Sequence, residues 1–114
     1  MGDPIIEAAA RKGSAELLIL SSLEDGQLHG YDIAREISRK SEGLLTFHVA
    51  SLYPLLYKLE DRGWIAGRWV EKTGQRRRRY YRLTAEGRRV LAKQRSRWEA
   101  FVAALTKAAG LRPA

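Results

Sequence analysis

The chain has 114 residues, of which 45% are hydrophobic and 30% are charged, a composition that predicts one globular domain and excludes a largely disordered chain. It has no cysteine, no apolar run long enough to cross a bilayer and no signal peptide, so we expect a cytoplasmic protein without disulfides or a membrane partner. The formal net charge of +8 favours a polyanionic partner, with nucleic acid ahead of an acidic membrane surface.

Two helices are predicted in the first 40 residues. Residues 1–12 are expected to fray or to form a short helix. Residues 14–23 are apolar on more than one side, which indicates a buried helix, and Asp25-Gly26 ends it. A second helix fits residues 31–40, and Gly43 is expected to stop it in a left-handed conformation. Its inner face carries Ile33, Ala34 and Ile37.

Residues 46–65 organise the rest of the chain, and most of them are predicted to form one helix. Apolar residues recur there at steps of three and four and make one face: Val49, Leu52, Leu56 and Leu59. Thr46 is a candidate N-cap, and Gly63 stands just past the expected end. Proline is tolerated only near a first turn, so Pro54 implies a helix that starts close to Ala50 or bends there.

The next segment is predicted to be a β-hairpin followed by a long last helix. Residues 64–70 and 79–83 are rich in aromatic and β-branched side chains, and a glycine-bearing turn separates them. Tyr81 and Leu83 are two apart and should both point inward, and Thr84 should cap the last helix. The hairpin also holds the densest basic run of the chain: Lys72, Arg76, Arg77, Arg78 and Arg79.

A basic run is often only a solvated face, but three helices followed by a basic hairpin is the winged helix-turn-helix arrangement. We therefore predict a mainly α fold with a small β-hairpin, in which residues 1–84 bind DNA and residues 85–114 form a dimerisation helix. The third helix would read base edges while the hairpin arginines lie along the DNA backbone or minor groove. Its side chains off the apolar face are candidate contacts: Ser51, Tyr53, Tyr57 and Lys58, the last with phosphate.

The last helix carries a stripe over more than two heptads: Leu91, Gln94, Trp98, Phe101, Leu105 and Ala108. The stripe packs either on its own domain or on a second copy, and a small winged domain has little surface to spare for it, which favours a homodimer. Trp98 leaves two interpretations open. It is either a plain interface residue, or it forms with its symmetry mate a slot for a small planar, often cationic, aromatic effector.

Three motifs in this order and spacing resemble the PadR-type bacterial transcriptional regulators, in particular short members with one C-terminal helix. They are His29-Gly30-Tyr31-Asp32-Ile33, Ser51-Leu52-Tyr53-Pro54 and Tyr80-Tyr81-Arg82-Leu83-Thr84. The resemblance implies a dimeric winged-helix repressor with Tyr53 and Pro54 in its recognition helix, and Tyr31 and Pro54 join the candidate DNA contacts. In short members that sense drugs, an aromatic residue placed like Trp98 forms a ligand site between subunits.

The sequence does not predict an enzyme. It has no glycine-rich phosphate loop, no metal-ligand cluster and no cysteine nucleophile, so we expect no cofactor and no metal. His29 stands at a helix start, where it is expected to cap the helix or face phosphate. The alternative function is a winged-helix module that binds RNA or another protein. Residues 47–50 depart from the small and polar residues that many relatives carry before the Ser-Leu-Tyr-Pro motif.

Overall fold

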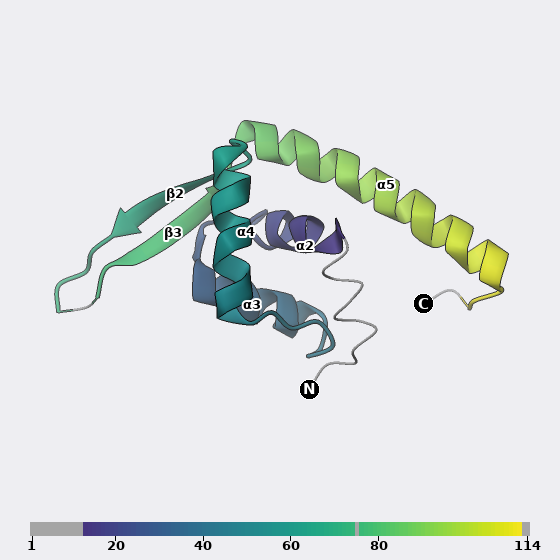
Figure 1. The fold of residues 1–114 in the computed structure, drawn as a ribbon, viewed down its shortest axis with the longest axis horizontal. Helices are drawn as coiled ribbons and strands as arrows, with labels where there is room; N and C mark the ends of the chain where they lie inside the picture. Colours follow the sequence, from purple (N-terminus) through teal and green to yellow (C-terminus); the bar gives the residue numbers. More distant parts are fainter. Residues whose placement is uncertain (1–12, 75, 113–114) are drawn as a thin grey trace.

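The computed structural model describes residues 13–74 and 76–112, so the expectation for residues 1–12 lies outside the described residues. The elements follow the order α2 (Ala15–Ser22), β1 (Leu28–His29), α3 (Gly30–Lys40), α4 (Val49–Asp61), β2 (Ile65–Val70), β3 (Arg78–Leu83) and α5 (Ala85–Ala109). Helices α2, α3 and α4 form a central group, from which the β2–β3 hairpin and α5 extend in opposite directions (Figure 1). The predicted mainly α fold with a β-hairpin is confirmed.

The core lies between the three central helices and the base of the hairpin. Ala34, predicted on the inner face of the second helix, is only partly buried against this core. The buried core side chains are Ile19, Leu20, Leu23, Ile33, Ile37, Leu52, Leu56, Leu59, Ile65, Tyr81, Leu83 and Leu91. The predicted inner face of α4 is confirmed at Leu52, Leu56 and Leu59, but Val49 is 36% exposed. Val49 lies in the first turn of α4, where the preceding chain from Thr46 to His48 runs along the surface.

The prediction that Thr46 caps α4 is wrong, because the helix begins at Val49 and its N-cap residue is His48. The backbone closes this end without a side-chain cap: the amides of Ser51 and Leu52 both donate to the carbonyl oxygen of His48 at 3.0 Å. Pro54 therefore lies in the second turn, close to where the expected start at Ala50 would have placed it. At the other end Gly63 stands just past the helix as predicted, with φ 79°, and the left-handed conformation expected of Gly43 is confirmed by its φ of 81°.

The sheet has three antiparallel strands in the order β1-β3-β2, and β1 was not predicted. Strand β1 is two residues long and pairs with the base of the hairpin, with Leu28 opposite Tyr81. In the hairpin, Gly67 lies opposite Tyr81 and Trp69 opposite Arg79. Because residues that face each other across an antiparallel pair share one side of the sheet, Trp69 and Arg79 stand on the same side as buried Tyr81.

The junction between the hairpin and α5 is tightly closed. Thr84 caps α5 as predicted, since its Oγ1 accepts from the Gly87 amide at 3.0 Å. The Thr84 amide in turn donates to the carbonyl oxygen of Trp64 at 3.1 Å. A Cβ atom at Gly87 would lie only 1.9 Å from that same Trp64 oxygen. The start of α5 therefore rests against backbone that leaves room for glycine alone.

The inner half of α5 is fixed to α2 by polar contacts. Arg95 binds both carboxylate oxygens of Glu24, at 2.7 and 2.8 Å, and donates to Ser21 Oγ at 3.1 Å. The hydrogen bond from Arg95 lowers the pKa of Glu24 below its usual value. Gln94 Nε2 donates at 3.3 Å to Glu16, which also accepts from Arg62 at the end of α4, at 2.7 Å. Glu16 therefore connects α2 to both α4 and α5.

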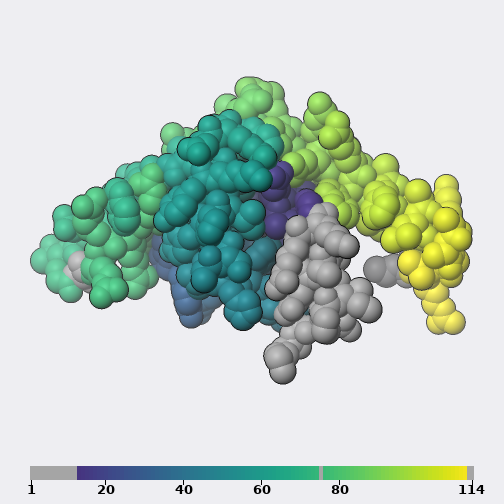
Figure 2. All heavy atoms as spheres, viewed as in Figure 1, coloured from purple at the N-terminus to yellow at the C-terminus, as the bar shows by residue number. Residues whose placement is uncertain are grey.

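The outer half of α5 extends away from the rest of the chain and ends at Gly110, which has φ 66° (Figures 1 and 2). Phe101 and Leu105 on this half are 55% and 45% exposed. By contrast Leu91, which we expected at a dimer interface, is only 3% exposed and belongs to the core of its own domain. No helix in the described part of the chain is both long and apolar enough to span a bilayer.

Tyr81 gives rise to a prediction about stability at alkaline pH. Its side chain is fully buried, burial raises its pKa to about 12, and its hydroxyl has no hydrogen-bond partner among the described residues. The phenol of the unfolded chain ionises near pH 10, so the folded protein holds this proton more tightly than the unfolded chain does. The protonated Tyr81 therefore contributes fully to the free energy of unfolding below pH 10, and this contribution is lost as the pH rises towards 12. At pH 11 the loss should be about 1.4 kcal/mol.

Urea denaturation of the wild type and Tyr81→Phe at pH 8 and pH 11 measures this loss. At pH 8 the variant should be about as stable as the wild type, because it removes only an unpartnered hydroxyl. At pH 11 the variant should be the more stable protein by about 1.4 kcal/mol. Tyr31→Phe, at an exposed position on α3, serves as the control and should show no such difference. Equal pH dependence in the wild type and Tyr81→Phe would contradict the prediction.

Candidate nucleic-acid interface

An open hollow of about 540 Å³ lies between the start of α3, the side of α4 and the hairpin. Most of the predicted DNA contacts meet there, although they come from three separate segments of the chain. The lining residues are His29, Tyr31, Tyr53, Tyr57, Trp69, Arg76, Arg77, Arg78 and Arg79. The hollow combines aromatic rings on one side with guanidinium groups on the other.

The tyrosine side of the hollow is built on α3 and α4. Tyr31 and Tyr57 are each more than half exposed, and the rings of Tyr53 and Tyr57, one helical turn apart, are 6.1 Å from each other. Tyr53 lies against the start of α3, where a Cβ atom at Gly30 would come within 2.6 Å of its hydroxyl. Gly30 therefore allows α4 to approach α3 closely enough for all three tyrosines to share one surface.

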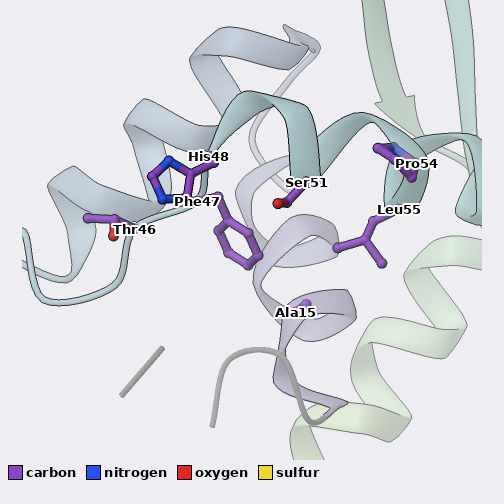
Figure 3. A pocket seen from close by; sticks show the side chains of 7 residues that line it. All are labelled: Ala15, Thr46, Phe47, His48, Ser51, Pro54 and Leu55. Atoms are coloured by element: carbon purple, nitrogen blue, oxygen red, sulfur yellow. The ribbon is translucent and has the colours of Figure 1, made fainter. Parts of the chain in front are cut away.

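Ser51 and Pro54 lie apart from this group. Both are exposed on α4, but they line a different hollow of about 290 Å³, next to α2. Figure 3 shows the ring of Phe47 and the side chain of Leu55 projecting from the same region towards Ala15. Lys58 is exposed on α4 and lines neither hollow. The predicted α4 contacts therefore spread over its exposed surface, and only the tyrosines face the hairpin.

The hairpin arginines differ in their surroundings. Arg76, Arg77 and Arg78 are exposed, whereas Arg79 is half-buried and pairs with Glu60 Oε2 at 2.5 Å. Glu60 also accepts from the Gly67 amide at 3.3 Å, so its carboxylate ties α4 to both strands of the hairpin. Because Arg79 is paired with Glu60, its charge is less available to a phosphate than the charges of the exposed hairpin arginines.

Arg78 lies opposite Val70 at the outer end of the paired strands, where its side chain contacts His29. Its Nη1 lies 2.9 Å from His29 Nε2, but that ring nitrogen also lies 2.9 Å from Asp32 Oδ2, to which it can donate. The His29 ring meets the edge of Tyr80 with centroids 5.5 Å apart. His29 Nδ1 accepts from the Asp32 amide at 3.3 Å, which confirms that His29 caps α3. The sequence indicated the cap, but the contact between His29 and Arg78 joins positions 49 residues apart and has no local signal.

The opposite side of the hairpin is also cationic. A second hollow of about 460 Å³ is lined there by Val70, Lys72, Arg76, Arg78 and Tyr80. The hairpin therefore presents positive charge on both sides, with guanidinium groups that can form paired hydrogen bonds to phosphate. The described residues include no cluster of three or more side chains suited to hold a metal ion. This surface is equipped to bind a polyanion along the hairpin and planar or methyl groups along the tyrosines.

Comparison with solved structures identifies similar proteins. A transcriptional regulator from Clostridium thermocellum matches with a TM-score of 0.79 and 32% identity, over 89% of this chain and 97% of that one. A PadR family transcriptional regulator from Eggerthella lenta matches with a TM-score of 0.78 and 28% identity, over 92% and 89%. Bacillus subtilis PadR, solved in complex with operator DNA, matches with a TM-score of 0.66 and 28% identity, over 73% of this chain and 46% of that protein.

Sequence comparison agrees with the structural one. A protein of Lysinibacillus sphaericus described as uncharacterized is 26% identical over 87 residues, which cover 76% of this chain and 80% of that protein. The sequence profile of the family described as "Transcriptional regulator PadR-like family" matches residues 19–93. That range contains all three predicted motifs, the whole sheet and the whole of α4. The chain belongs to the PadR-like family of transcriptional regulators.

Proposed function

We propose that the chain is a sequence-specific DNA-binding regulator that acts as a dimeric repressor in the cytoplasm. The observation that carries this proposal is the hollow in which the tyrosines of α3 and α4 face the arginines of the hairpin. Two further facts support it: the net charge of +8, and the similarity to Bacillus subtilis PadR, which was solved with operator DNA.

In this proposal α4 enters a major groove and the hairpin follows the adjacent backbone or minor groove. The phenol rings of Tyr53 and Tyr57 and the pyrrolidine ring of Pro54 offer apolar contact to base edges, and the Ser51 hydroxyl can hydrogen-bond to them. Lys58 and the exposed hairpin cations neutralise phosphates, which sets most of the affinity and its dependence on salt. Tyr31, at the positively polarised start of α3, lies where a phosphate would approach.

Binding assays with three ligands test the proposed function against its alternatives. The wild type should bind a DNA duplex selected from a random library more tightly than an unselected duplex, and both more tightly than single-stranded RNA at the same salt concentration. Preference for RNA would favour the RNA-binding alternative. No binding to either nucleic acid would favour a protein-interaction module.

The proposed dimer surface is the outer half of α5. Its stripe of Trp98, Phe101, Leu105 and Ala108 remains available, whereas Leu91 is buried and Gln94 is bound to Glu16. Exposed large apolar side chains on a helix that extends away from its own domain are typical of a subunit interface. A two-fold axis through this region would place two α4 helices for a palindromic site, with half-sites about one DNA turn apart.

Sedimentation of the double variant Phe101→Asp, Leu105→Asp tests this surface. The wild type should sediment as a dimer and the variant as a folded monomer, because burying two carboxylates without partners costs several kcal/mol each. Ser96→Asp, Ala103→Asp is the matched control, since it adds two carboxylates at exposed positions on the opposite side of α5 and should remain dimeric. A folded Phe101→Asp, Leu105→Asp variant that still dimerises would exclude the stripe as the interface.

The proposed effector site lies on the same stripe. The rings of Trp98 and Phe101 meet edge to face with centroids 5.8 Å apart, and together with Arg97 they line a shallow hollow of about 270 Å³. The guanidinium of Arg97 favours a neutral or anionic planar molecule over the cationic one first expected. Titration with planar aromatic acids and cations, followed by tryptophan fluorescence, discriminates between these classes. Quenching that persists in Trp98→Ala would leave Trp98 as a plain interface residue.

A further inference from the structure

Trp69 is the large apolar side chain of the hairpin that core packing does not explain. It lies in the last but one pair at the outer end of the β2–β3 ladder, opposite Arg79, on the side of the sheet that faces α4. Its side chain is 56% exposed, although neighbouring Tyr81 on the same side is fully buried. An indole left this open on a cationic hairpin requires a role other than stabilising the core.

Two guanidinium groups lie near the Trp69 ring. The Cζ atom of Arg77 is 4.7 Å from the ring centroid and that of Arg79 is 5.4 Å away, both within the range of cation–π attraction. Arg79 is held by Glu60, whereas Arg77 has no ion-pair partner among the described residues. The indole therefore holds one arginine whose charge is already neutralised and one whose charge remains available.

We propose that Trp69 is a positioning residue, which holds the guanidinium of Arg77 in place for a DNA phosphate beside the recognition helix. This inference rests on the proposed DNA-binding function and adds a residue that determines its strength. A guanidinium whose face contacts an aromatic ring keeps its in-plane N–H groups free, and those are the groups that bind phosphate. A free arginine on a hairpin must lose side-chain entropy on binding, and the contact with Trp69 reduces that loss in advance.

The same contact sets the direction in which Arg77 points. Glu60 on α4 binds the Gly67 amide and Arg79, and Arg79 lies against both Trp69 and Tyr81. A Cβ atom at Gly67 would come within 2.8 Å of Arg79 Nε, so the strand lies close against this arginine. Through these contacts the position of Trp69, and with it that of Arg77, is fixed relative to the recognition helix. Arg77 accordingly lines the same hollow as Tyr53 and Tyr57.

A double-mutant cycle tests the proposal on the full-length protein. The probe is a DNA duplex of about 30 base pairs that the wild type has selected from a random library, long enough for two half-sites. Trp69→Ala should weaken binding about three-fold per wing, and so about ten-fold for a dimer, without changing the number of charges. Arg77→Ala should weaken binding and reduce the salt slope by about one unit per wing. Adding Trp69→Ala to Arg77→Ala should have no further effect.

Trp69→Phe distinguishes positioning from general stability. It keeps an aromatic face for Arg77 and should recover most of the affinity that Trp69→Ala removes, while melting temperatures of all variants remain close to that of the wild type. Two results would overturn the proposal: Trp69→Ala binding as tightly as the wild type, or Trp69→Ala weakening binding equally with and without Arg77. Failure of the wild type to select any duplex would instead overturn the proposed function, so the two failures are distinguishable.

Discussion

Gly87→Ala will destabilise the fold by about 3 kcal/mol or more, because a methyl group there collides with backbone rather than with a side chain that can move. The added Cβ would lie 1.9 Å from the Trp64 carbonyl oxygen, which also accepts from the Thr84 amide. Relieving the collision requires α5 to move away from the turn between α4 and β2, which breaks that hydrogen bond and loosens the packing of Leu83 and Leu91. For a domain of this size the melting temperature should fall by about 10 °C or more.

Helix propensity alone would predict the opposite effect on stability. Alanine is favoured over glycine inside a helix by about 1 kcal/mol, so without the collision the variant would be the more stable protein. Gly74→Ala is the matched control, because it adds the same methyl group where nothing lies within 4 Å, at φ 75°. The control should cost about 1 kcal/mol from backbone strain alone. Thermal and urea unfolding of both variants measure the difference, and a stable Gly87→Ala protein would show that α5 can shift at this junction without penalty.

We expect Arg77→Ala, Arg78→Ala to lower the affinity for duplex DNA by about 100-fold or more at moderate salt, because it removes from each wing two exposed guanidinium groups that we propose bind phosphate. Both side chains are exposed in the hollow beside α4. The melting temperature should change little, since exposed charges contribute little to stability. The slope of log affinity against log salt should fall by about 0.9 for each phosphate that is no longer neutralised, and anisotropy titrations over a range of salt concentrations measure it.

The matched control for the wing variant is Arg88→Ala, Lys93→Ala. It removes the same charge from exposed positions on α5, outside the hollow formed by α3, α4 and the hairpin. If general attraction between the protein and DNA were responsible, both double variants would weaken binding alike. If the hairpin arginines contact DNA directly, only the wing variant will lose most of its affinity. Unchanged affinity in the wing variant would mean that the basic run is only a solvated surface.

Periodicity predicted most of the fold, because it reports which side of an element meets the core. Steps of three and four identified Leu52, Leu56 and Leu59, and alternation identified Tyr81 and Leu83. Periodicity failed where an element ends: Val49 continues the pattern but lies in the first turn, beyond the core. Strand β1 is too short to carry a pattern of its own, and it exists because β3 offers it an edge.

The candidate site was predictable in composition but not in detail. The basic run and the motifs pointed to segments that line one hollow, yet they could not distinguish Arg79 from Arg77. That difference depends on Glu60, which lies 19 residues away in the sequence and 2.5 Å away in space. The sequence likewise did not predict that Trp69 lies beside Arg79, because that contact depends on the register between β2 and β3. Ion pairs and strand register are tertiary features, and no local pattern encodes them.

The hairpin and the outer half of α5 extend in opposite directions, so a small rotation at one of them produces a large displacement at the other. The chain is 55 Å long in its longest dimension, and these two parts lie at its two ends (Figures 1 and 2). A rotation of a few degrees about the end of α5 therefore becomes a displacement of several ångströms at the hairpin, comparable to the spacing of neighbouring base pairs. In a dimer joined through α5, small changes in the angle between subunits would be enough to move both wings out of register with the grooves of a DNA duplex.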